Sequence, residues 1–118
     1  MIGADVFDGT TLHTDKALVL DGDVVSSIND VASLSGSCQQ VVLDGGTIMP
    51  GFVDLQVNGG GGVMLNDAPS LEALRTISQA HLSTGTRAFL PTLITDTPQI
   101  TQAAVDAVEP VSYTHLRA

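Results

Sequence analysis

The sequence predicts an α/β protein, because its residues fall into two parts with different patterns. Residues 1–46 alternate short apolar runs with Asp-Gly turns, which is typical of a small antiparallel β unit. Residues 47–110 alternate two strand-like segments with two helix-like segments. Strands that are separated by helices usually pair in parallel, so the second part predicts parallel strands covered by helices.

The composition is that of a globular protein. Of the 118 residues, 43% are hydrophobic and 14% are charged, and the formal net charge is −9. The four Lys and Arg residues are scattered, so we expect neither a nucleic acid nor an anionic membrane as a partner. The sequence shows neither a signal peptide nor an apolar run long enough for a membrane span, and we expect a cytoplasmic protein.

Cysteine and histidine residues, the usual ligands of zinc, are few and far apart. Cys38 is the single cysteine, so it has no disulfide partner and belongs to no zinc-binding cluster. His13, His81 and His115 do not share a ligand spacing such as i, i+4 on one helix. We therefore expect structural or surface roles for them and assign no metal ligand.

The first part predicts four short strands. Apolar residues alternate over 2–6, and the segments 17–20 and 24–28 form a hairpin around Asp21-Gly22. An Asp-Gly pair favours a type I′ turn, which requires a positive φ at both of its central residues. A further strand is expected over 40–43.

The second part predicts the order strand, helix, strand, helix. The strand 52–58 precedes a helix that is capped by Ser70 and ends near Gly85. The next strand, 88–94, contains a proline and is expected to be irregular or to end early.

The final helix has the clearest start in the chain. Thr97 can cap it, and Pro98 occupies the first helical position, where a missing N–H costs nothing. We expect Pro110 to end it.

The strand 52–58 has one polar and one apolar face. Alternation places these residues on the polar face: Phe52, Asp54, Gln56 and Asn58. It places these on the other, which we expect to pack against helices: Val53, Leu55 and Val57.

The polar face favours a closed barrel. Both faces of an open parallel sheet are usually apolar. The strands of a closed barrel, by contrast, carry polar catalytic side chains at the carboxyl-end rim of the barrel. We therefore expect Gln56 and Asn58 to point into the mouth of a site, with Asp54 deeper. The alternative is an antiparallel edge strand whose polar face meets solvent.

The glycine run that follows is interpreted as an adaptable loop at the rim of that site. Glycine lets a backbone pass close to a ligand, so we expect Gly59 and Gly60 to line the site. The run does not fit a phosphate-binding loop, since Met64 stands where a third glycine is required. A flexible loop without a function is the alternative.

Two motifs carry a resemblance to a known family. The segment IMPGFVDLQVNGGGGVMLND, followed by LPTLITD, resembles the N-acetylglucosamine-6-phosphate deacetylases of the amidohydrolase superfamily, over about residues 41–97. The family combines a small β-sandwich with a (β/α)₈ TIM barrel. The resemblance implies part of the sandwich in 1–46 and the first two βα units of the barrel in 47–110. Residues 111–118 fit neither and are interpreted as a non-native or disordered tail.

The resemblance also implies an activity. The family hydrolyses N-acetylglucosamine 6-phosphate to glucosamine 6-phosphate and acetate with one divalent metal ion, such as zinc. Many members of the superfamily carry metal-binding histidines at the positions of Gln56 and Asn58, and amides bind such metals poorly. We expect the metal ligands and the catalytic Asp outside this chain, which is interpreted as an inactive, marginally folded N-terminal fragment of a homo-oligomeric enzyme.

Two other functions remain open. The chain could be part of another amidohydrolase that acts on a cyclic amide or amine. It could also be a non-enzymatic β/α module that uses its glycine loop to bind a partner.

Overall fold

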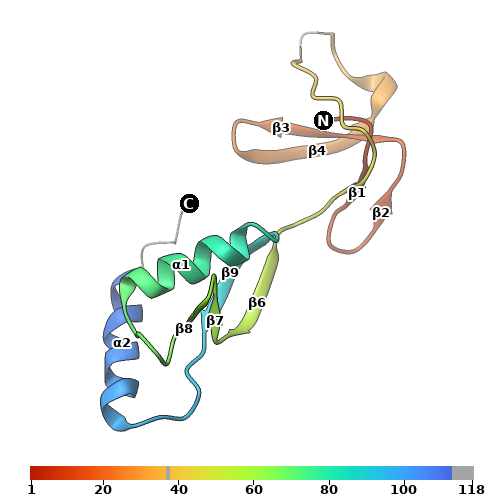
Figure 1. Cartoon of the computed structure of the whole chain (residues 1–118). Helices are drawn as coiled ribbons and strands as arrows, with labels where there is room; N and C mark the ends of the chain where they lie inside the picture. Colours follow the sequence, from red (N-terminus) through yellow and green to blue (C-terminus); the bar gives the residue numbers. More distant parts are fainter. Residues whose placement is uncertain (37, 113–118) are drawn as a thin grey trace. The chain divides into compact units, whose positions relative to one another are not determined.

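The computed structural model describes residues 1–36 and 38–112, and the backbone alone at Ser112 (Figure 1). The chain divides into two compact units, Met1–Pro50 and Gly51–Ala118. The sequence predicts a tail at 111–118. Residues 113–118 of that tail lie outside the described residues. As predicted, the protein is a mixed α/β chain.

The first unit contains a small mixed sheet in the order β2-β1-β5. Strand β1 (Asp5–Phe7) pairs antiparallel with β2 (Leu12–His13) and parallel with β5 (Thr47–Ile48). The predicted purely antiparallel unit was therefore wrong. The long connection between β2 and β5 allows the chain to return in the direction of β1.

A hairpin forms the rest of this unit. Strand β3 (Lys16–Asp21) pairs antiparallel with β4 (Val24–Asp30), as predicted. The turn lies one residue later than expected, at Gly22 and Asp23. Gly22 has a φ of 57°, whereas Asp23 has no positive φ, so the predicted type I′ turn was wrong.

The strand predicted over 40–43 was also wrong. Val42 forms only an isolated parallel bridge with Ile2, and the Leu43 N–H donates to the Ile2 carbonyl at 2.9 Å. Gly3, with a φ of 86°, interrupts the alternation that predicted a strand from residue 2. A Cβ on Gly3 would lie 2.3 Å from the Leu43 carbonyl oxygen, so glycine is required there. After β4, the chain forms a short 3₁₀ helix, Val31–Ser33.

The turn between β1 and β2 is held by Asp8. Its Oδ1 accepts the N–H groups of Thr10 and Thr11, both at 2.8 Å, and its Oδ2 lies 2.7 Å from Nε2 of His13. The hydrogen bond to His13, followed by the two backbone N–H groups, lowers the pKa of Asp8 from 3.8 to about 2. These contacts stabilise the ionised carboxylate.

We expect Asp8 to stabilise the folded unit in a pH-dependent way. Since its pKa is lower in the folded state, the stabilisation is present above about pH 4 and is lost as the pH falls toward 2. Asp8→Asn should therefore narrow the stability difference between neutral and acidic pH. Carboxyl-detected NMR titration of the unsubstituted chain measures the Asp8 pKa on which this expectation rests, and a pKa at or above 3.8 would contradict it.

The second unit pairs its two longest strands in parallel, as predicted. Strand β6 (Phe52–Val57) lies beside β9 (Thr86–Pro91), and the helices α1 (Leu71–Leu82) and α2 (Pro98–Ser112) follow them in turn (Figure 1). Strand β9 ends at its proline. The buried core consists of side chains from β6, α1 and the segment before α1: Val57, Leu65, Leu74 and Ile77.

Both helix starts are confirmed. Ser70 Oγ accepts the Ala73 N–H at 3.2 Å, and Thr97 Oγ1 accepts the Ile100 N–H at 3.3 Å. The predicted end of α2 was wrong, because Pro110 lies inside the helix. The fixed φ of proline suits a helix, and near the helix end its missing N–H removes only one intrahelical bond.

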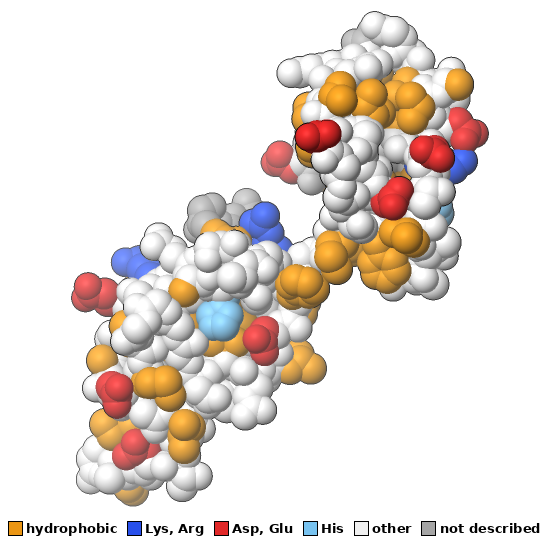
Figure 2. Space-filling view, turned by 45° about the vertical axis from the view of Figure 1, so that its right-hand side comes forward, with side chains coloured by type: hydrophobic (Ala, Val, Ile, Leu, Met, Phe, Trp, Pro, Cys, Tyr) orange, Lys and Arg blue, Asp and Glu red, His pale blue; other side chains and the backbone are white. Residues whose placement is uncertain are grey.

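Apolar side chains are visible on the surfaces of both units (Figure 2). In the second unit, the most exposed large apolar residues of the strands are Leu55 at 70% and Val53 at 64%. Across the described residues, the two helices are too short or too polar to cross a membrane.

Candidate functional site at the carboxyl ends of β6 and β9

The pairing register of β6 shows which of its side chains face the helices. Asp54 pairs with Phe89, whose ring packs against the core beneath the helices, and Val57 is itself part of that core. Two residues separate Asp54 from Val57, and the register shifts between them. A strand with such a bulge cannot keep a two-residue alternation throughout.

The expectation that Val53 and Leu55 pack against the helices was therefore wrong. Val53 pairs with Ala88, on the face opposite Phe89, and both Val53 and Leu55 are exposed. Asp54 lies on the helix side rather than deep in a site with Gln56. The bulge reverses the alternation after Leu55, so Leu55 and Gln56 are exposed side by side.

Gln56 and Asn58 share the face away from the helices, because Val57 between them points into the core. Within the bulged stretch, Oδ1 of Asp54 accepts the backbone N–H of Gln56 at 3.0 Å. Gln56 is exposed, and Asn58 is half-buried. The two predicted residues therefore lie together at the carboxyl end of β6.

Asn58 connects the ends of the two parallel strands. Its Nδ2 donates to the Thr92 carbonyl at 2.9 Å, while the Thr92 N–H donates to the Val57 carbonyl at 2.8 Å. The backbone carbonyl of Asn58 accepts the Leu65 N–H at 2.8 Å. Within the described residues, no hydrogen bond is found for its side-chain oxygen, which can therefore accept one from a ligand.

The glycine run forms a tight hairpin, and its predicted adaptability at the rim of a site stays a prediction. Strand β7 (Gly59–Gly60) pairs antiparallel with β8 (Val63–Met64), and Gly61 and Gly62 turn with φ values of 63° and 80°. These φ values favour glycine.

The hairpin packs closely on helix α1. A Cβ on Gly60 would lie 3.1 Å from the His81 ring, and one on Gly61 would lie 3.0 Å from the Thr76 side chain. His81 Nε2 lies 2.9 Å from the Gly59 carbonyl oxygen, so Nε2 must carry the donated proton. The His81 ring also lies 6.0 Å from that of Phe89. His81 has the structural role that the sequence predicts.

Asn66 is a residue that the sequence reasoning did not single out. Its Nδ2 donates to the Ile94 carbonyl and to Asp96 Oδ2, both at 2.9 Å, and its Oδ1 accepts the Ile94 N–H at 3.1 Å. Asn66, followed by the backbone N–H of Thr97, lowers the pKa of Asp96. In the sequence, this role is signalled only by an asparagine that follows the glycine run after a few residues.

The chemistry offered by the described residues at this edge is hydrogen bonding. Gln56 and Asn58 supply amides, which are poor ligands for transition metals. No group of three or more His, Cys, Asp or Glu side chains that could hold a metal is found in the part of the chain that the structure describes. These residues do not fit a metal centre, and we derive no metal-dependent step from them.

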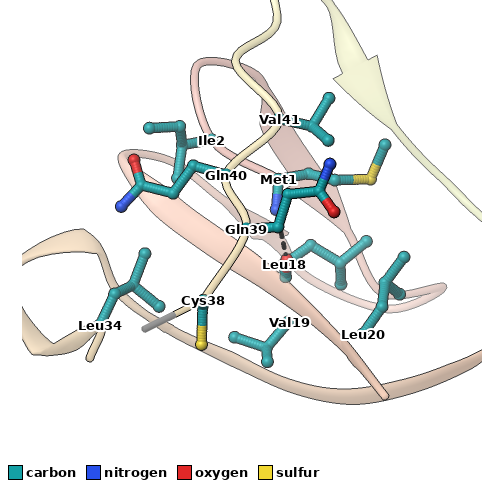
Figure 3. Close-up of a pocket in the computed structure, with 10 residues that line it drawn as sticks. All are labelled: Met1, Ile2, Leu18, Val19, Leu20, Leu34, Cys38, Gln39, Gln40 and Val41. Atoms are coloured by element: carbon teal, nitrogen blue, oxygen red, sulfur yellow. Dashed lines mark hydrogen bonds between the residues drawn. The ribbon is translucent and has the colours of Figure 1, made fainter. Parts of the chain in front are cut away.

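A hollow of about 360 Å³ lies in the first unit (Figure 3). Met1 donates its terminal amino group to the Leu18 carbonyl at 2.8 Å there. The lining is mainly apolar: Met1, Ile2, Leu18, Val19, Leu20, Leu34, Cys38, Gln39, Gln40 and Val41. The exposed Cys38 thiol lies 3.4 Å from Ser35 Oγ, and the hollow shows no arrangement of catalytic groups among the described residues.

Two curated relatives match most of the chain. An N-acetylgalactosamine-6-phosphate deacetylase from Shewanella sp. (strain ANA-3) is 58% identical over 108 residues, which are 90% of this chain and 27% of the relative. An N-acetylglucosamine-6-phosphate deacetylase from Haemophilus influenzae is 36% identical over 105 residues, 89% of this chain and 28% of the relative. Over about nine tenths of its length, the chain is therefore similar to amino-sugar-phosphate deacetylases.

A solved structure shows the same similarity. The crystal structure of N-acetylglucosamine-6-phosphate deacetylase from Pasteurella multocida matches 95% of this chain and 30% of that protein, with a TM-score of 0.84 and 34% identity. The chain thus spans between a quarter and a third of the length of the deacetylases that it matches. A scan against models of protein families found no match.

Proposed function

We propose that this chain is part of an enzyme that hydrolyses N-acetylglucosamine 6-phosphate to glucosamine 6-phosphate and acetate. The observation that carries the proposal is the extent of the match, which covers about nine tenths of the chain in two curated deacetylases. In this proposal, Gln56, Asn58, Gly59 and Gly60 line the active site. Their place at the carboxyl ends of parallel strands supports it, because ligands of α/β folds bind there.

A second substrate is favoured by one observation. The N-acetylgalactosamine-6-phosphate deacetylase is 58% identical to this chain, whereas the N-acetylglucosamine-6-phosphate deacetylase from Haemophilus influenzae is 36% identical. N-acetylgalactosamine 6-phosphate differs from the first substrate only in the configuration of one hydroxyl group. Both substrates would undergo the same amide hydrolysis.

The proposal extends to the fold of the whole enzyme. We place β6 and β9 as the first two strands of a (β/α)₈ barrel, with the first unit in a small β-sandwich. The helices cover one face of the β6-β9 sheet, while Val53, Leu55 and Leu90 are more than half exposed on the other. Further strands that close a barrel would bury this apolar face.

Within this site, the described residues would orient the substrate. The side-chain oxygen of Asn58 can accept a hydrogen bond from a sugar hydroxyl or a water molecule while its Nδ2 stays bound to the Thr92 carbonyl. Gln56 offers both a donor and an acceptor beside it. Since neither side chain titrates, the proton transfers of hydrolysis require other groups.

A grafted enzyme tests the proposed function. In it, residues of this chain replace the matched segment of the Shewanella deacetylase, and acetate release is measured with each of the two amino-sugar phosphates. We expect activity on at least one of them, and a shift in preference relative to the unmodified enzyme if this segment contributes to specificity. A grafted enzyme that folds with an unchanged thermal midpoint but hydrolyses neither substrate would overturn the proposal.

Leu55→Asp tests the proposed barrel. Leu55 is 70% exposed in this chain, so the change should leave the 118-residue chain folded as before and raise its soluble yield. In the grafted enzyme the same carboxylate would be buried and should cost about 3 kcal/mol. Soluble expression and thermal unfolding of both proteins check this. A grafted enzyme whose thermal midpoint does not fall with Leu55→Asp would argue against a closed barrel.

A further inference from the structure

The segment that follows β9 has no regular structure, yet side chains hold its backbone at alternate residues. Asn58 binds the carbonyl of Thr92, and Asn66 binds both the carbonyl and the N–H of Ile94. The side chains of two asparagines thus bond to the backbone of this segment, as a neighbouring strand would in a sheet. Both asparagines flank the glycine hairpin, Asn58 directly before it and Asn66 shortly after it.

The side chain of Asn66 is half-buried, and both ends of its amide are hydrogen-bonded. Its three hydrogen bonds, between 2.9 and 3.1 Å, reach residues 28 or 30 positions away in the sequence. Asp96 in turn accepts the N–H of Thr97, the cap of α2, at 2.7 Å. Asn66 therefore connects the hairpin to the start of the second helix.

We propose that Asn66 is a positioning residue of the deacetylase site, acting through Asn58. By fixing Ile94 and Asp96, Asn66 holds the preceding Thr92 carbonyl where the Asn58 amide binds it, and so sets the direction of the Asn58 side-chain oxygen. Asn66 itself does not touch the substrate. This inference rests on the proposed function, since it gives Asn66 a role in the same site.

Asn66→Asp in the grafted enzyme tests the inference. The carboxylate cannot donate to the Ile94 carbonyl, and it places a negative charge beside Asp96. We expect kcat/KM to fall by at least about tenfold, because small displacements of positioned groups have effects of this size. Asn29→Asp is the matched control, since the Asn29 side chain bonds to Ser27 on its own strand, β4 of the first unit, and this change should leave kcat/KM unchanged.

Two further measurements separate positioning from a purely structural role. Adding Asp96→Asn to the Asn66→Asp variant restores an amide-carboxylate pair with the partners exchanged and should recover part of the lost kcat/KM. In an Asn58→Ala background, Asn66→Asp should have little further effect, because the group through which it acts is gone. If Asn66→Asp does not fold, Asn66→Ser removes the same bonds without a charge and takes its place in this cycle.

The outcomes distinguish this inference from the proposed function. An unsubstituted grafted enzyme that folds with an unchanged thermal midpoint but is inactive would overturn the proposed function and this inference with it. An active grafted enzyme in which Asn66→Asp behaves like Asn29→Asp would overturn only the role of Asn66. The role of Asn66 would likewise be overturned if Asn66→Asp had an equal effect with and without Asn58.

Discussion

Gly59→Ala is expected to destabilise the grafted enzyme by about 3 kcal/mol, near the upper end of overpacking effects. A Cβ at this position would lie 2.4 Å from the Val63 carbonyl oxygen and 2.9 Å from the Met64 sulfur. The carbonyl belongs to the paired strand of the hairpin, so it cannot move without breaking the pairing of β7 with β8. Movement of the hairpin would also disturb the His81 contact to the Gly59 carbonyl.

Gly62→Ala is the matched control in the same hairpin. A Cβ on Gly62 would meet no atom within 4 Å, so only its φ of 80° opposes the change. A left-handed conformation costs a residue with a side chain about 1 kcal/mol. The thermal midpoint should therefore fall clearly further for Gly59→Ala than for Gly62→Ala. Equal midpoints would show that the hairpin adapts, as its glycine composition predicts.

Leu74→Ala is expected to have the largest effect of the changes considered, about 4 kcal/mol. Leu74 on α1 has an exposure of 0% and lies in the core with Val57, Leu65 and Ile77. The core is small, so neighbouring side chains can do little to fill the cavity that alanine would leave. Loss of this core would also release Val57, which holds the bulged end of β6 against the helix.

The matched control is Leu12→Ala, since Leu12 is 53% exposed in the first unit. Its effect should stay within about 0.5 kcal/mol, as is usual for surface positions. Thermal unfolding followed by circular dichroism compares the two variants in the 118-residue chain, where this exposure of Leu12 holds. A Leu74→Ala midpoint close to that of Leu12→Ala would mean that this cluster does not carry the stability of the second unit.

The local features of the second unit could be predicted from the sequence because their causes are local. Ser70 and Thr97 cap their helices through their own hydroxyl groups, and the alternation of strands and helices predicted that β6 and β9 pair in parallel. The errors arose where a distant contact overrides a local preference. Gly3, for example, must approach the Leu43 carbonyl, and that approach interrupts the strand expected there.

The sequence by itself determined the elements of the second unit, the positions of Gln56 and Asn58 at a strand end, and the resemblance to the deacetylases. Only the tertiary structure decided which faces these side chains occupy. A bulge in β6 reverses the alternation between Leu55 and Gln56, and neither residue type predicts a bulge there. Likewise, the glycines became a hairpin because His81 and Thr76 lie directly beneath them, and Asn66 gained its role from Ile94, 28 positions away. Contacts between residues so far apart depend on the folded chain as a whole.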